Sequence, residues 1–162
     1  MNAVRSILVS LLAAGALGAG AAHAQTHPSL FSKQARAEQS RVVIDQKGRD
    51  NGVAVGQNGR LNAAELFQRG VMNTGMVTQT GTGNAATIRQ VGKNNDASIV
   101  QTGNNNVACV YQVGRNLSAG VTQDGNGQSV GVIQTKKGTY QFPGEMCVLE
   151  AVGLRYITRK YN

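Results

Sequence analysis

The sequence predicts an all-β fold, a parallel β-solenoid of 22-residue strand–turn–strand coils, each made of two 11-residue half-repeats. Three observations predict it: Gln recurs every eleven residues, Gly follows two residues after nearly every such Gln, and aliphatic residues recur at a fixed later offset. The composition agrees, because 21 Gly and 4% aromatic residues in a chain of 162 leave little bulk for an ordinary globular core.

The N-terminal segment, residues 1–24, is predicted to be a secretory signal peptide. A single Arg5 precedes a mostly apolar stretch that ends in Ala22-His23-Ala24, the small-residue pattern of a cleavage site. Residues 25–39 are expected to be a flexible export or targeting segment. The repeat should therefore occupy residues 40–134 of an exported chain and leave residues 135–162 as a C-terminal segment.

The repeat is defined by three series of residues that share one spacing of eleven. The Gln series is Gln46, Gln57, Gln68, Gln79, Gln90, Gln101, Gln112, Gln123 and Gln134. The Gly series is Gly48, Gly59, Gly70, Gly81, Gly92, Gly103, Gly114 and Gly125. The Asn series, five residues after Gln, is Asn51, Asn62, Asn73, Asn84, Asn95 and Asn106.

The parity of these offsets predicts an inside and an outside. Asn at offset five, a small or β-branched residue at seven, an aliphatic residue at nine and the next Gln at eleven all share one face of a strand. The Gly-containing offsets one to four are expected to be turns, which leaves strands of six or seven residues. Between Ser40 and Gln134, no charged residue occupies an inward position; eight fall in the expected turns and five face outward.

Buried amides require hydrogen-bond partners, and stacked coils supply them. With strands about 4.8 Å apart, each amide can bond the identical amide one coil away. We expect one Gln ladder from Gln46 to Gln134, another from Gln57 to Gln123, and two Asn ladders. The terminal coils should then present unpaired backbone and amides that template another chain.

The C-terminal segment, residues 135–162, departs from the repeat. Cys147 lies there, and the compartment makes a Cys109–Cys147 disulfide the default expectation for two exported cysteines. The runs 147–151 and 153–158 look strand-like. The segment is expected to cap one end of the solenoid, with Arg155, Arg159 and Lys160 as possible envelope contacts; a frayed terminus is the alternative.

In the spacing of its Gln, Gly and Asn series, the sequence resembles the curlin family, the subunits of extracellular curli amyloid fibres. Ser40, Gln46, Gly48, Asn51 and Gln57 match the family signature, with Val in place of Ala at position 53. The resemblance implies a cross-β fibre subunit of a Gram-negative bacterium. Such a subunit leaves through the outer-membrane curli secretion pore with accessory proteins and stacks end to end on itself or another curlin.

Within this family, the sequence favours a minor subunit that nucleates or tethers the fibre, acting in adhesion and biofilm formation. Lys47 is expected to stack over Arg69, and Lys93 over Arg115, which disfavours indefinite stacking. A curlin-like anchor for a holdfast adhesin and the major curlin subunit remain alternatives. A monomeric ice- or polysaccharide-binding solenoid is less favoured, because the outward positions are mixed.

Charge and residue types bear on the partners and on catalysis. The net charge of +8 favours anionic partners such as envelope polysaccharide or lipopolysaccharide, although a solvated basic face is equally consistent with it. No specific nucleic acid is expected. His27 is the only His after residue 24, so no His-based triad or metal cluster is expected, nor a cofactor or an enzymatic activity.

Overall fold

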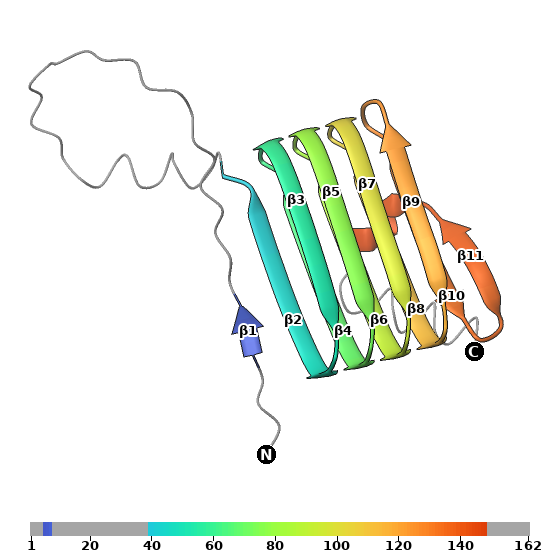
Figure 1. Cartoon of the computed structure of the whole chain (residues 1–162). Coiled ribbons are helices and arrows are strands. Elements are labelled where there is room, and N and C mark those ends of the chain that lie inside the picture. Colours follow the sequence, from blue (N-terminus) through green and yellow to red (C-terminus); the bar gives the residue numbers. More distant parts are fainter. Residues whose placement is uncertain (1–4, 8–38, 149–162) are drawn as a thin grey trace, which may run out of the picture.

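A computed structural model describes residues 5–7 and 39–148, in which most residues belong to two β-sheets (Figure 1). The large sheet has the strand order β1-β2-β4-β6-β8-β10-β11, and the small sheet has the order β3-β5-β7-β9. The strands of the large sheet are β1 (Arg5–Ile7), β2 (Arg41–Arg49), β4 (Ala63–Val71), β6 (Ala85–Lys93), β8 (Val107–Arg115), β10 (Ser129–Thr135) and β11 (Gly138–Phe142). Those of the small sheet are β3 (Gly52–Arg60), β5 (Thr74–Thr82), β7 (Asp96–Asn104) and β9 (Ser118–Asp124). A 3-10 helix, η1 (Gly144–Val148), follows β11.

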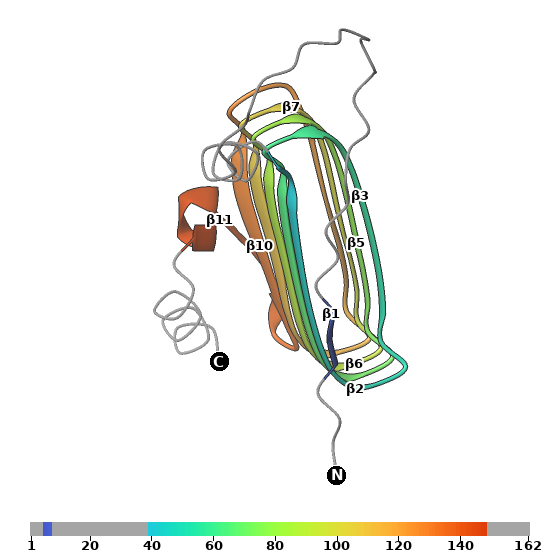
Figure 2. The ribbon, with the colours of Figure 1, turned by 90° about the vertical axis from the view of Figure 1, so that its left-hand side faces the viewer.

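The chain winds alternately through the two sheets, so that β2 and β3 form one coil and each later pair forms the next. Figure 2 shows the flattened coils along the stacking direction, with the two sheets facing each other. Successive coils pair in parallel at a constant separation of 22 residues, as in Gln46 opposite Gln68 and Gln57 opposite Gln79. The predicted fold class, a parallel β-solenoid of 22-residue coils, is confirmed.

The core between the sheets is narrow and consists of one aliphatic row and one row of small residues in each sheet. Leu66 and Ile88 of the large sheet and Val77 and Ile99 of the small sheet are completely buried, and Ala64 lies beside them. These are the offset-nine and offset-seven positions, which the parity argument placed inside. Because the sheets approach so closely, no ring side chain belongs to this cluster.

The strands are longer than expected, and the turns are correspondingly shorter. Strands β2 to β8 each have nine residues and continue through the Gly two residues after Gln. The expectation that these glycines occupy turns is therefore wrong for seven of them; Gly125, just after β9, lies outside a strand. Of the eight charged residues expected in turns, Asp50 alone lies outside a strand, at a corner with φ of 57°.

The strand glycines are required because the backbones of successive coils approach closely. Gly81 has φ of 117°, and a Cβ added there would overlap the carbonyl oxygen of Gly103 in the next coil. The same approach recurs along the stack, for example between Gly70 and Gly92. Only Gly combines this φ with this contact, so the Gly series is explained by coil stacking rather than by turn formation.

The residues after β10 form a hairpin and a helical turn instead of a further coil. Strand β11 pairs antiparallel with β10, with Gly131 opposite Phe142 and Thr135 opposite Gly138. The strand-like interpretation of 147–151 is wrong for Cys147, which lies in η1 after the helix-initiating turn at Pro143. Residues 149–162, including the expected strand at 153–158, lie outside the described residues.

The opposite edge of the large sheet is paired with β1. Arg5 lies opposite Gln46 and Ile7 opposite Ile44, in antiparallel orientation. Strand β1 falls inside residues 1–24, whose removal as a signal peptide stays a prediction. The boundaries at 24, 39 and 134 are likewise predictions, although the stacked coils begin at Arg41.

A pair of Gly-to-Ala substitutions tests the role of coil contact. We expect Gly81→Ala to lower the free energy of unfolding by more than about 2 kcal/mol, because it adds a Cβ at positive φ against backbone. Gly56→Ala is the control, since no atom lies within 4 Å of its added Cβ. Guanidinium unfolding of the two soluble variants measures the difference, and equal midpoints would contradict the explanation.

Candidate assembly interface

Identical Gln side chains bond to one another along both sheets. In the large sheet, the Nε2–Oε1 distances are 2.6 Å from Gln46 to Gln68, 2.8 Å from Gln68 to Gln90, 2.9 Å from Gln90 to Gln112 and 2.8 Å from Gln112 to Gln134. In the small sheet, Gln57, Gln79, Gln101 and Gln123 are joined by three bonds of 2.8 Å. In every bond, the earlier residue donates to the residue one coil later.

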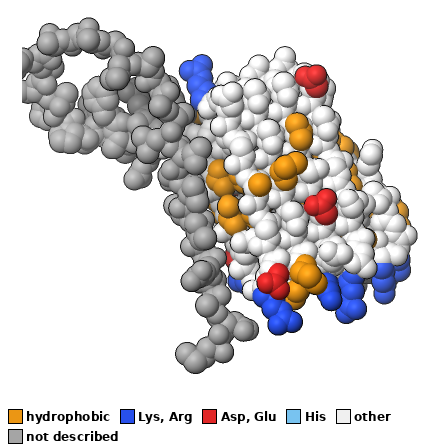
Figure 3. All heavy atoms as spheres, in the orientation of Figure 1, with side chains coloured by type: hydrophobic (Ala, Val, Ile, Leu, Met, Phe, Trp, Pro, Cys, Tyr) orange, Lys and Arg blue, Asp and Glu red, His pale blue; other side chains and the backbone are white. Residues whose placement is uncertain are grey.

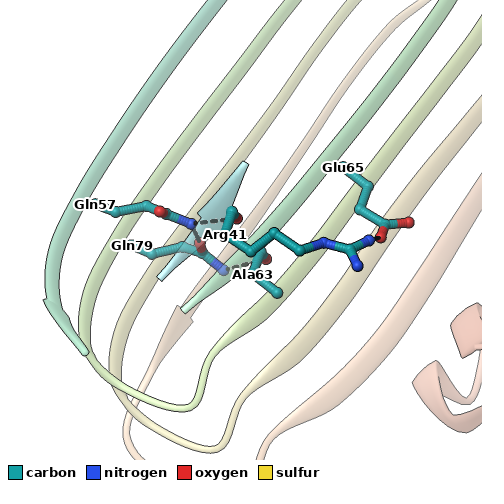
Figure 4. Close-up of polar contacts among 5 residues, drawn as sticks. All are labelled: Arg41, Gln57, Ala63, Glu65 and Gln79. Atoms are coloured by element: carbon teal, nitrogen blue, oxygen red, sulfur yellow. Dashed lines mark hydrogen bonds and ion pairs between the residues drawn. The ribbon is translucent and has the colours of Figure 1, made fainter. Parts of the chain in front are cut away.

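Every ladder Gln after Gln46 also bonds across the interior to the opposite sheet. Figure 4 shows Gln57 donating to the carbonyl oxygen of Arg41 at 3.3 Å and Gln79 to that of Ala63 at 3.1 Å. From the large sheet, Gln68 donates to the Gly52 carbonyl at 2.9 Å. The buried amides therefore connect coil to coil and sheet to sheet, and their burial is compensated.

The Asn series makes a second, different set of contacts. Asn73 donates its Nδ2 to Oδ1 of Asn51 at 3.0 Å, and Asn95 donates to Asn73 at the same distance. At the other corner of the coils, just before the strands of the large sheet, the corresponding bond from Asn84 to Asn62 is 3.2 Å long. The backbone N–H of Asn106 donates to Asn84 Oδ1 at 3.1 Å, as in the earlier members of the series, but the hydrogen bond between the two side chains is not formed there.

Each Asn also binds the Gly of the following coil. Asn62 donates to the Gly81 carbonyl at 3.0 Å, and Asn106 donates to the Gly125 carbonyl at 2.8 Å. All six members of the series make this bond; the other four pairs are Asn51 with Gly70, Asn73 with Gly92, Asn84 with Gly103 and Asn95 with Gly114. This contact was not predicted from the sequence, although Asn and Gly have a constant 19-residue separation in the repeat.

The Asn ladders are completed at their ends by other residues. Ser40 lies 22 residues before Asn62, and its Oγ accepts the backbone N–H of Asn62 at 3.2 Å, as an Asn Oδ1 does elsewhere. At the other end, the backbone N–H groups of Leu117 and Gln128 donate to Asn95 and Asn106. The spacing of Ser40 therefore identifies it as the first residue of a ladder, a role that its place in the family signature did not predict.

Charged side chains gather where the strands of the large sheet end. Figure 3 shows Lys and Arg side chains along this edge of the molecule. The Lys and Arg at the ends of β2, β4, β6 and β8 and in the turn after β10 are Lys47, Arg49, Arg69, Lys93, Arg115, Lys136 and Lys137. Lys47 is the register partner of Arg69, and Lys93 is the register partner of Arg115, so like charges occupy adjacent strands.

On the outer face of the large sheet, other charged side chains have neighbours. Arg41 and Glu65 form an ion pair between adjacent strands, also seen in Figure 4. The guanidinium of Arg89 lies 4.5 Å from the centre of the Phe67 ring, a cation–π contact. These residues face outward, in agreement with their parity.

A disulfide joins Cys109 of β8 to Cys147 of η1, across 38 residues of sequence. Cys109 is on the outward parity of its strand, yet it is fully buried because η1 covers it. Tyr111 lies beside it, stacks on Phe142 with ring centres 6.1 Å apart, and donates from its hydroxyl to the Cys147 carbonyl at 3.3 Å. The possible anchor residues Arg155, Arg159 and Lys160 lie outside the described residues.

The chemistry available in this arrangement is hydrogen bonding between repeated amides and exposed strand edges. Within residues 5–7 and 39–148, no three His, Cys, Asp or Glu side chains come together as metal ligands. The same part of the chain contains no helix of the length and apolarity needed to cross a membrane.

Replacing one buried Gln tests the contribution of the ladders. We expect Gln101→Leu to destabilise the solenoid by about 3 kcal/mol, because Gln79 loses an acceptor and the buried Oε1 of Gln123 loses its donor. Gln141→Leu, at an exposed position in β11, should change stability by less than about 0.5 kcal/mol. Denaturant unfolding measures both, and a neutral Gln101→Leu would contradict the role assigned to the amides.

Comparison with known proteins agrees with this geometry. The family model for the curlin associated repeat matches residues 70–103 and again residues 103–135. No curated protein matches the chain. Each match covers about three half-repeats of the stacked region in which the amide ladders are continuous. These two adjacent matches identify residues 70–135 as curlin repeats and support a structural subunit of the curli type.

Proposed function

We propose that this chain is a minor curlin subunit that nucleates the fibre and tethers it at the cell surface. The observation that carries the proposal is the closed edge of β10. Strand β11 pairs with that edge, and the Oγ of Thr139 accepts the Nε2 of Gln134 at 3.0 Å where the next ladder Gln would otherwise lie. A chain closed at one end can begin or terminate a fibre, but it cannot continue one.

The stacked like charges support the same assignment. Lys47 beside Arg69 and Lys93 beside Arg115 each place two cations about one strand spacing apart. Each exposed pair opposes stacking by a few tenths of a kcal/mol, which disfavours the alternative of a bulk polymer subunit.

The curlin repeats imply self-association into fibres and an extracellular location on the cell surface. Beyond this, we propose that the chain leaves the cell through the outer-membrane curli secretion pore with its accessory proteins. Residues 25–39 serve as the targeting segment for this export, and the assembled fibre acts in adhesion and biofilm formation. Because assembly rests on hydrogen bonds and strand stacking, none of these roles requires catalysis.

Seeding tests the nucleating role. Secreted chain is added at substoichiometric amounts to monomeric major curlin, and thioflavin T fluorescence follows fibre growth. We expect the lag to shorten several-fold, because an ordered template removes the need to form the first coils. Heat-unfolded, reduced chain serves as the control. An unchanged lag would eliminate nucleation and leave the anchor function.

The seven Lys and Arg side chains at the ends of the large-sheet strands and in the turn after β10, called the cation row below, favour a second candidate function. This function is attachment to an anionic envelope polymer, as in an anchor that links a holdfast adhesin to the envelope. Five members of the row come from the ends of four successive large-sheet strands, and Lys136 and Lys137 extend it to the turn after β10. A linear polyanion or a lipopolysaccharide surface can contact several of these cations at once. This candidate is compatible with nucleation, because it uses a side of the solenoid and not its end.

A matched pair of Arg substitutions tests this surface. Arg115 and Arg60 are each the last residue of a nine-residue strand and both are exposed, but only Arg115 belongs to the row. We expect Arg115→Gln to weaken binding to lipopolysaccharide micelles about fivefold at low salt, and Arg60→Gln to weaken it much less. Sedimentation at increasing salt measures both. Equal losses would mean that net charge, and not the row, determines binding.

A further inference from the structure

We infer that the N-terminal face of the solenoid, formed by β2 and β3, is the face on which the next subunit stacks. We further infer that this subunit is a curlin-repeat chain with a bare final coil, and not a second copy of this chain. This inference rests on the proposed nucleating function. It specifies the end of the solenoid from which the fibre grows, the relative direction of the two chains and the kind of chain that stacks there.

The direction follows from the polarity of the Gln ladders. In every Gln–Gln bond the Nε2 of the earlier residue donates toward the C-terminal end, and the Oε1 of the later residue accepts from the N-terminal side. Oε1 of Gln46 and Oε1 of Gln57 are therefore the two acceptors left at the N-terminal face. No donor from the described residues bonds to either oxygen. A partner stacking there must present Gln amide donors from its C-terminal coil, so the contact is head to tail.

The backbone of β3 presents a matching open edge. The N–H of Gly52 donates to the carbonyl of Asn73, the residue just before β5, so the N–H and C=O groups of residues 52, 54, 56 and 58 face the next coil. The alternate residues Val53, Val55 and Gln57 then direct their N–H and C=O groups outward. Within the described residues, no strand pairs with this edge. A parallel strand from an incoming chain can add here.

The neighbouring edge of β2 is paired with β1 over three residues. These residues belong to the predicted signal peptide, so its removal on export leaves β2 and β3 open together. The two strands lie in opposite sheets and form the first coil, and thus one complete coil of a partner can stack on them.

A second copy of this chain lacks the required surface. The stack has nine strands, β2 to β10, of which five belong to the large sheet and four to the small sheet. The strand that follows β10 in the winding would therefore lie in the small sheet. A following copy can supply its own β2 at that position only if it is rotated by half a turn about the stacking axis. The last two strands of the preceding copy, β9 and β10, would then pair with β2 and β3 of the next. In every copy, however, β11 occupies the outer edge of β10, and Thr139 binds the Gln134 amide.

The cap that closes this end is firmly attached. Phe142 of β11 lies against Gly131 of β10, where an added Cβ would overlap its ring. Phe142 also stacks on Tyr111, and the Cys109–Cys147 disulfide fixes η1 to the outer face of β8. The outer edge of β10 is therefore held closed by packing and by a covalent bond, whereas the outer edge of β2 becomes open once the predicted signal peptide is removed.

Two proline substitutions distinguish the ends. Val53 directs its N–H to the open edge of β3. In β9, Thr122 directs its N–H to the outer edge, because the Asp96 N–H donates to the Leu117 carbonyl and sets the opposite parity for residues 118, 120 and 122. Proline at either position removes an outward donor without removing a bond inside the solenoid. Exported Val53→Pro should fail to shorten the thioflavin T lag of monomeric major curlin, whereas Thr122→Pro should seed as the wild type does.

Site-specific crosslinking provides a measurement that does not depend on the folding of Val53→Pro. A benzophenone side chain placed at Ala54 or at Thr122, two exposed positions in the edge strands β3 and β9, reports contact with major curlin in early fibres. We expect crosslinks from position 54 at least tenfold above those from position 122. Equal crosslinking, or a preference for position 122, would overturn the assignment of the end.

The remaining outcomes separate this inference from the function on which it rests. If wild-type chain does not seed, nucleation itself fails and the inference fails with it. If wild type and Val53→Pro seed equally, nucleation stands but the N-terminal face is not the template. Fibre growth from oxidised wild-type chain alone would show that a second copy can dock and would contradict the closed C-terminal end.

Discussion

The stacking of identical amides in exact register is the interaction on which the rest of this structure depends. A Gln amide placed between two closely packed sheets must use both of its N–H groups and its oxygen, or its burial is strongly unfavourable. Gln101, for example, donates to Gln123 and to the Ala85 carbonyl and accepts from Gln79. A shift of one coil by a single residue would break these bonds throughout the stack, so the ladders select one register as well as stabilising it.

The Gly and Asn series are consequences of the same close approach. Coils that stack at one strand spacing bring Gly81 against Gly103, where no Cβ fits, and the carbonyl of Gly81 is then bound by Asn62. The three recurring offsets of the repeat therefore describe one unit: an amide that links coils, a glycine that permits their contact and an asparagine that binds the glycine carbonyl. The narrow aliphatic core fills the space that remains.

Polarity and closure turn this repetitive scaffold into a subunit with two different ends. The N-terminal face leaves the oxygens of Gln46 and Gln57 as acceptors, whereas the last ladder amide of the large sheet, that of Gln134, donates to Thr139. Curlin-type assembly needs only strand edges and amides, which every repeat carries. The non-repeat segment after β10 pairs with the outer edge of β10, whereas no strand within the described residues pairs with the outer edge of β9.

The sequence by itself determined the period, the inward and outward positions, the 22-residue register and the residues placed along each ladder. These features were predictable because strand parity and periodic spacing are local properties, repeated nine times along the chain. The tertiary structure alone decided that the strands continue through Gly81 and its equivalents, since that depends on contact with the next coil. It also decided that Thr139 lies beside Gln134 and that η1 buries Cys109. These contacts occur only once and involve residues outside the 11-residue repeat, so no periodic pattern in the sequence predicts them.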